Sequence, residues 1–168
     1  MSKSIFEYTF RQLLDRDVQL LKALLRVFGE AFADLPTYQD AIPSDAYLAE
    51  LLSGTQFIAL AALAGDEVVG ALAAYELVKF ERERKEIYIY DLAVMAGHRR
   101  RGVAKGLINE LKRIASERGA YVIFVQADPP DAPAVALYES LGTRETVYHF
   151  DIAVPEIRAS SIPARSNH

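Results

Sequence analysis

The stretch 86–118 constrains the fold of this chain more than any other segment. It opens with residues 87–94, an almost continuously apolar run of the length expected for a buried strand. A bend with three consecutive arginines and Gly102 follows. Apolar residues then recur at helical spacing from Val103 onward, and Gly119 is suited to end that helix. We therefore expect a buried strand that passes through a basic bend into the N-terminus of an amphipathic helix.

The rest of the sequence predicts an α/β sandwich with a mixed sheet, because strand-like and helix-like patterns alternate along it. Further strands are expected at 5–12, 57–63, 68–77, 121–127 and 144–153. Further helices are expected after the N-cap candidates Asp17 and Ser44 and over 133–141. In this interpretation residues 1–154 form a single domain, and 155–168, rich in Ser, Pro and Ala, form a tail.

The composition excludes several classes of function. The 168 residues include no cysteine, which excludes a disulfide framework, thiolate metal sites and a cysteine nucleophile. Only three histidines are present, so we expect no metal site. The net charge of −4 argues against nucleic acid as a partner. No apolar run is long enough for a membrane helix, and no signal-peptide core follows Met1, so we expect no membrane partner and a cytoplasmic location.

The bend before the long helix has the chemistry of an anion site. Backbone N–H groups at a helix N-terminus lack partners and the helix dipole is positive there, so a phosphate group binds well. Gly102 permits unusual dihedral angles and Ala104 leaves room for a ligand, while positive charge comes from Arg99, Arg100 and Arg101. The pattern is neither the three-glycine dinucleotide fingerprint nor a P-loop. It predicts a site for a pyrophosphate-bearing cofactor, and the alternative is a basic turn that caps an ordinary helix.

At these residues the sequence resembles the GNAT superfamily of acetyl-coenzyme A-dependent N-acetyltransferases. Arg99, Gly102 and Ala104 match its pattern of Arg or Gln, two residues, Gly, one residue, and Gly or Ala. Tyr138, a few residues before Gly142, matches a second superfamily element. The resemblance implies the GNAT fold, acetyl-coenzyme A as the cofactor, and a strand whose end splays from its neighbour to pair with the pantetheine arm. The cofactor-binding residues that it implies are Leu92, Ala93, Val94, Arg99, Arg100, Arg101, Gly102, Val103, Ala104, Lys105, Asp131 and Tyr138.

A closer resemblance, over most of residues 20–153, is to the aminoglycoside 3-N-acetyltransferases of the GNAT type. It is carried by the stretches 55–75, 86–94, 119–128 and 149–152. It implies that acetyl is transferred directly, in a ternary complex, to an amine of an aminoglycoside, the 3-amine of the deoxystreptamine ring, which would give resistance to the antibiotic. The alternatives are an acetyltransferase for another amine, such as a polyamine or a protein N-terminus, and a non-catalytic acetyl-coenzyme A sensor.

Acetyl transfer to an amine needs a neutral attacking amine, a stabilised oxyanion and support for the departing thiolate. Asp91, in an otherwise apolar strand, is the candidate base or ammonium anchor, and a structural acceptor is the alternative. Tyr138 is the candidate acid for the thiolate, with a core tyrosine as the alternative. The resemblance implies that the Val94 N–H stabilises the oxyanion. Alternation puts Tyr88 and Tyr90 on one face of the strand and Asp91 on the other, unless a bulge intervenes.

A polycationic substrate needs several acceptors. The predicted substrate-binding residues are Asp34, Tyr38, Glu81, Asp91, Asp128 and Asp151, with Asp40, Glu83 and Asp131 as further acidic candidates. For each acidic residue the alternative is a solvated surface, and the charged segment 79–85 is either a solvated loop or a loop over the site. The sequence also allows a homodimer whose contact is formed by the apolar last strand and the tail.

Overall fold

The computed structural model describes residues 7–155. Ile5 and Phe6 of the predicted first strand, and nearly all of the predicted tail, lie outside the described residues. The elements in chain order are β1 (Tyr8–Gln12), α1 (Val18–Phe32), η1 (Pro36–Asp40), α2 (Asp45–Ser53), β2 (Phe57–Ala64), β3 (Glu67–Val78), β4 (Lys85–Val94), η2 (Ala96–His98), α3 (Val103–Glu117), β5 (Ala120–Val125) and α4 (Ala132–Glu139). No helix within this part of the chain has the length and apolarity needed to cross a membrane.

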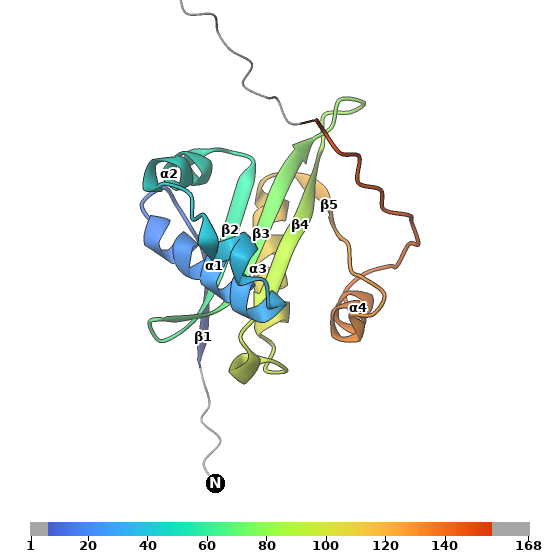
Figure 1. The fold of residues 1–168 in the computed structure, drawn as a ribbon. Coiled ribbons are helices and arrows are strands. Elements are labelled where there is room, and N and C mark those ends of the chain that lie inside the picture. The colour runs from blue at the N-terminus through green and yellow to red at the C-terminus, as the bar shows by residue number, and fades with distance from the viewer. Residues whose placement is uncertain (1–6, 156–168) are drawn as a thin grey trace, which may run out of the picture.

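The described residues form a five-stranded sheet in the order β1-β2-β3-β4-β5. Neighbouring strands from β1 to β4 are antiparallel, whereas β4 and β5 are parallel because α3 connects them. Helices α1 and α2 cover one face of the sheet, α3 covers the other, and α4 lies beyond the β5 edge (Figure 1). The predicted α/β class with a mixed sheet is therefore confirmed.

Local signals place the helix ends close to where the sequence predicts them. The Ser44 hydroxyl accepts a hydrogen bond of 3.3 Å from the Tyr47 N–H and so caps α2. Asp17 does precede α1, but its carboxylate accepts from the Leu14 N–H at 2.9 Å and pairs with Arg11 rather than capping the helix. The predicted cap position is therefore right, and the predicted capping bond is not made.

Apolar side chains fill the space on both faces of the sheet, as the continuously apolar β2 and β3 predict. The contact between β1 and α3 is especially close. A Cβ added at Gly106 would lie 2.1 Å from the Phe10 ring, so only glycine allows α3 to pack at this distance from β1. This packing fixes where the N-terminus of α3 lies relative to the end of β4.

The predicted strand at 144–153 is absent from the structure, and this prediction is wrong for the single chain. Residues 143–155 form neither helix nor strand. Their alternate residues Tyr148, Phe150 and Ile152 are 80% to 90% exposed. The sequence pattern is that of a strand with one apolar face, but a strand forms only where another edge pairs with it. In this structure the segment runs apart from β5 (Figure 1).

Candidate active site

The carboxyl end of β4 has an open side. β3 and β4 pair as far as Val94, whereas the pairing of β4 with β5 ends at Ile89 and Val125. Residues 90–94 therefore have no strand beside them on the β5 side. The Met95 N–H donates to the Val69 carbonyl at 2.9 Å, toward β3. Because adjacent residues of a strand direct their backbone groups to opposite sides, the Val94 N–H faces the open side.

Two hydrogen bonds hold the bend after β4, one from the bend to the last residue of β4 and one from β1. The Arg99 Nε donates to the Val94 carbonyl at 2.9 Å, and the Tyr8 hydroxyl is hydrogen-bonded to His98 Nδ1 at 3.0 Å. Two residues adopt the left-handed region, Arg100 with a φ of 58° and Gly102 with a φ of 83°. Glycine adopts this region without strain, which is the physical reason for glycine immediately before α3.

The N-terminus of α3 presents free backbone donors. Its first backbone hydrogen bond runs from the Gly106 N–H to the Gly102 carbonyl at 2.8 Å, so the N–H groups of Val103, Ala104 and Lys105 precede the first bond. A Cβ at Gly102 would meet no atom within 4 Å, so there is open space beside these donors. Exposed arginines of the bend add positive charge. This end of α3 therefore fits a diphosphate group.

A β-bulge in β4 decides where Asp91 lies. Asp91 pairs with Ala73 and Ile89 pairs with Ala74, which leaves Tyr90 as an extra residue without a partner in β3. The bulge turns Asp91 toward η1 and α1. Simple alternation along β4 would instead place Asp91 on the sheet face opposite to Tyr88. The sequence offered both arrangements, and the structure contains the bulged one.

The Asp91 carboxylate is half-buried on the sheet face that α1 covers. The Tyr38 hydroxyl, from η1, donates to Asp91 Oδ2 at 3.1 Å. Burial raises the pKa of Asp91 above its ordinary value, and the Tyr38 hydrogen bond opposes that rise. Burial and the nearby carboxylate raise the pKa of Tyr38, so this phenol stays a donor. The arrangement is a desolvated carboxylate, which has the properties of a proton acceptor or an ammonium ligand.

Aromatic side chains from β3, β4 and β5 surround the Asp91 region. The Tyr90 ring makes edge contacts with Tyr75 and Tyr88, each with a centroid distance of 5.9 Å. Tyr88 stacks on Phe124 at 4.9 Å and donates to Gln126 Oε1 at 3.1 Å. Sequence reasoning singled out Tyr88 and Tyr90 but missed Tyr75, Phe124 and Gln126. Their nearness depends on strand pairing, and the only local signal for them was their place in apolar strands.

Tyr138 lies on the other side of the open end of β4. It belongs to α4 and packs with the α3-side core, in the same cluster as Leu92 and Val94. Burial, and to a lesser degree the charge of Asp131, raises the pKa of Tyr138 to about 12. The phenol therefore keeps its proton at neutral pH. Asp131 itself begins α4, where its carboxylate accepts from the Ala134 N–H at 3.2 Å.

The remaining predicted acidic residues do not gather at one place. Asp34 lies just before η1 and accepts from the Thr37 N–H at 3.3 Å, which places it near Tyr38. Asp128 lies in the turn between β5 and α4, at the same end of the sheet as Val94. Glu81 pairs with Arg84 at 3.2 Å in the loop that precedes β4, so the structure does not bring it to the open end of that strand.

Asp151 lies on the segment 143–155, is hydrogen-bonded to His149 at 3.0 Å, and has an almost fully exposed side chain, unlike the half-buried Asp91. Of the further candidates, Asp131 caps α4, Asp40 ends η1 and Glu83 is an exposed residue of the loop before β4. Among the described residues, no group of three or more His, Cys, Asp or Glu side chains could hold a metal ion.

Comparison with known proteins identifies the family of this arrangement. The sequence pattern of the acetyltransferase (GNAT) family matches residues 19–143. The chain belongs to the GNAT acetyltransferase family. An aminoglycoside acetyltransferase from an uncultured soil metagenomic sample is 57% identical to this GNAT chain, covers 89% of it and 99% of its own length, and superposes with a TM-score of 0.88. Another from such a sample, solved in complex with sisomicin, is 31% identical over 88% of this chain and 97% of its own, with a TM-score of 0.81.

A more distant relative is N-acetyltransferase 8B of Rattus norvegicus, which is 29% identical over 86 residues. The match covers 51% of this GNAT chain and only 39% of the rat protein. Family membership confirms the predicted GNAT fold, the acetyltransferase class and acetyl-coenzyme A as the cofactor. The residues of the bend and of the α3 N-terminus fit the diphosphate of that cofactor, and the open side of β4 fits its extended pantetheine arm.

Proposed function

We propose that this GNAT protein acetylates an amine of an aminoglycoside. The observation that carries the proposal is the position of Asp91, a desolvated carboxylate beside the open end of β4, near the half-buried Tyr75 ring and the exposed Tyr90 ring. The 57% identity to an aminoglycoside acetyltransferase over nearly all of that enzyme's length supports the same substrate class. A neutral ligand would gain little from an uncompensated carboxylate, whereas an ammonium group gains an ion pair.

The cofactor side supplies binding and oxyanion stabilisation through the backbone. Bound acetyl-coenzyme A supplies the acetyl group at its thioester carbon. We assign the diphosphate contacts to the backbone N–H groups of Gly102, Val103, Ala104 and Lys105, with the bend arginines adding charge. The Val94 N–H, which faces the open side of β4, would donate to the thioester oxygen as negative charge develops there.

The acceptor side supplies proton transfer. Asp91 anchors the substrate ammonium and takes its proton, directly or through a water molecule, so that the amine can attack. Burial makes Asp91 a better base than an exposed aspartate, because its pKa is raised. Tyr138 holds its proton at Oη and donates a hydrogen bond, or that proton, to the departing thiolate. The chain has no cysteine to form an acetyl-enzyme, and we assign direct transfer within a ternary complex.

The position of acetylation is the finer part of the proposal. On the resemblance to the aminoglycoside 3-N-acetyltransferases, we assign the reaction to the 3-amine of the deoxystreptamine ring. The experiment is thiol release from acetyl-coenzyme A with kanamycin B, spermidine and an N-terminal peptide in parallel, followed by NMR of the acetylated product. Turnover of kanamycin B with acetyl on the 3-amine supports the whole proposal.

The other outcomes of that assay separate the alternatives. Acetyl on a different amine of kanamycin B would overturn the assigned position and keep the substrate class. Turnover of spermidine or peptide alone would replace the substrate class. Binding of acetyl-coenzyme A without turnover of any amine would mean a sensor. We also propose that the reaction takes place in the cytoplasm and gives antibiotic resistance, which growth of a susceptible strain that expresses Asp91→Asn or wild-type protein would test.

We further propose that the protein is a homodimer in which residues 144–154 of one copy pair with the β5 edge of the other. β5 is the last strand of the sheet and leaves one edge unpaired within residues 7–155. The segment has a strand-type apolar face, and its Tyr148 is 90% exposed in the single chain. Pairing would give the β5 edge its backbone hydrogen bonds and would bury the apolar face of the segment at the same time.

Light scattering would measure the molar mass of the wild-type protein and of the double variant Phe150→Ser, Ile152→Ser. We expect a dimer for the wild type and a folded monomer for the variant, because the variant removes the apolar face without touching β5. A wild-type monomer at all concentrations would contradict the dimer, and a dimer that survives the double substitution would contradict this interface.

A further inference from the structure

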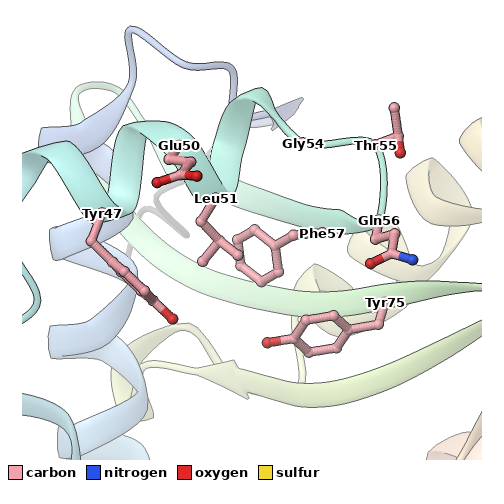
Figure 2. Close-up of a pocket in the computed structure, with 8 residues that line it drawn as sticks. All are labelled: Tyr47, Glu50, Leu51, Gly54, Thr55, Gln56, Phe57 and Tyr75. Carbon is pink, nitrogen blue, oxygen red and sulfur yellow. The ribbon is translucent and has the colours of Figure 1, made fainter.

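A pocket that the proposed mechanism does not use lies between the C-terminal end of α2 and the sheet. Its volume is about 500 Å³, and its lining residues are Tyr47, Glu50, Leu51, Gly54, Thr55, Gln56, Phe57 and Tyr75. α2, the start of β2 and β3 all contribute to it (Figure 2). Apolar and aromatic surface with a few polar groups is typical of small-molecule sites, and this volume takes one sugar ring.

Two of the polar groups that line this pocket are tyrosine hydroxyls. The hydroxyls of Tyr47 and Tyr75 point toward one another from α2 and β3, with the Phe57 ring beside them (Figure 2). No hydrogen bond joins these two hydroxyls to each other, and both residues line the pocket. Glu50 lies one turn along α2 from Tyr47 and makes no ion pair with any residue of 7–155. The pocket therefore offers hydroxyl groups and one uncompensated negative charge.

Tyr75 connects this pocket to the Asp91 region. Its ring contacts Phe57 at a centroid distance of 5.4 Å on the pocket side and Tyr90 at 5.9 Å on the side of Asp91. The charge of Asp91 contributes to the raised pKa of Tyr75, after burial and the other tyrosines, which agrees with their nearness. A ligand that extends from Asp91 across the Tyr75 and Tyr90 rings therefore enters this pocket.

We propose that the pocket is a second acceptor subsite that binds an outer amino-sugar ring of a substrate whose reacting ring lies at Asp91. The proposal rests on the proposed function, because it assigns the substrate of that same site more than one cationic ring. Glu50 would pair with an ammonium group of the outer ring, and the Tyr47 and Tyr75 hydroxyls would bind its hydroxyls. The aromatic rings would attract the ammonium further through cation–π contacts.

The test compares two substrates that differ by this ring. Neamine has two rings, and kanamycin B is neamine with a third, aminated ring. Steady-state kinetics and calorimetric titration in the presence of coenzyme A would be run on the wild type, Glu50→Gln, Tyr47→Ala and the control Asp66→Asn. Asp66 lies in the exposed β2–β3 turn, so it matches the charge change of Glu50→Gln outside the pocket. Both pocket residues are exposed side chains of α2, so neither substitution empties the core.

We expect each pocket variant to raise the KM and the Kd of kanamycin B about five- to tenfold, as for the loss of one ordinary hydrogen bond. The values for neamine, the kcat for both compounds and every value for Asp66→Asn should stay within about twofold. Equal effects on both compounds, or no effect on either, would overturn the subsite. If the wild type binds kanamycin B more tightly through these residues but acetylates neither compound, the subsite stands and the proposed function falls. If it binds neither compound, both fall.

Discussion

The two sides of the open end of β4 differ in whether backbone groups or side chains line them. On the cofactor side, the contacts that we propose come from backbone groups of one continuous stretch, from Val94 through the bend to Lys105. On the acceptor side, they come from side chains of separate elements, with Asp91 on β4, Tyr38 on η1 and Tyr75 on β3. A site made of backbone donors tolerates many side chains, whereas a site made of side chains changes with each substitution. The cofactor side therefore suits a group common to a whole family, and the acceptor side suits a particular amine.

The largest effect that would test this comparison is expected at Asp91. Asp91→Asn keeps the shape of the side chain and removes the negative charge, so the substrate amine loses both its anchor and its proton acceptor. We expect kcat/KM for the aminoglycoside to fall about 100-fold or more, as for the loss of an acid–base group. Thiol release measures it, and the affinity for coenzyme A should not change. Asp40→Asn, an exposed neighbour of the Tyr38 segment, is the control. A variant with wild-type turnover would remove Asp91 from the mechanism.

Tyr138 tests the boundary between the two sides, because it packs with the core on the α3 side and we propose that it acts in the chemical step. Its pKa is raised to about 12, so the phenol remains a donor at neutral pH. Tyr138→Phe removes only the hydroxyl, and we expect kcat to fall about 30-fold, as for a hydrogen bond to a developing charge. Calorimetry should give an unchanged Kd for coenzyme A. Turnover equal to the wild type at every pH would contradict the role.

Gly102 tests whether the cofactor side depends on backbone geometry alone. Its φ of 83° disfavours any side chain, although a Cβ there would meet no atom within 4 Å. Gly102→Val should therefore weaken coenzyme A binding about tenfold by straining the bend, without filling a protein cavity. The matched control is Gly97→Val, where an added Cβ also meets no atom within 4 Å and φ is not left-handed. Calorimetric titration compares the two, and equal losses would contradict a backbone cause.

The smallest effect is expected from Tyr38, and it concerns pH. The Tyr38 hydrogen bond lowers the pKa of Asp91 against the rise that burial causes. Tyr38→Phe removes that bond, so the Asp91 pKa rises further and its carboxylate is protonated at a higher pH. We expect the acidic limb of the kcat/KM profile to move to higher pH, with a loss of about threefold or less at neutral pH. Tyr90 makes no hydrogen bond to Asp91, so the control Tyr90→Phe should leave the acidic limb of the profile in place.

The same contrast explains how much the sequence could predict. The strand, bend and helix around Gly102 are local, so periodicity and one glycine predict them, and Ser44 predicts the start of α2 in the same way. The acceptor side is not local. Tyr75, Phe124 and Gln126 reach the Asp91 region only through strand pairing, and no spacing in the sequence reveals that pairing.

The strand predicted at 144–153 failed for a related reason. Its alternating pattern is correct for a half-buried strand, but pattern alone does not say which edge will pair with it. Tyr148 and its neighbours stay exposed because the segment does not pair with the free edge of β5 in the single chain. For Glu81 the charge alone suggested a ligand, and in the structure it pairs locally with Lys79 and Arg84, which favours the alternative of a solvated loop.

The bulge at Tyr90 makes the length of β4 as important as its composition. The unpaired Tyr90 turns Asp91 toward Tyr38. Tyr90 directly follows Ile89, which forms the last residue pair between β4 and β5. Removing or adding a residue there would reverse the orientation of the carboxylate and shift the backbone groups that face the cofactor in a single event. Insertions and deletions between 88 and 94 should therefore be far less tolerated than substitutions, and variation among natural enzymes of this shape should accumulate in the surrounding side chains.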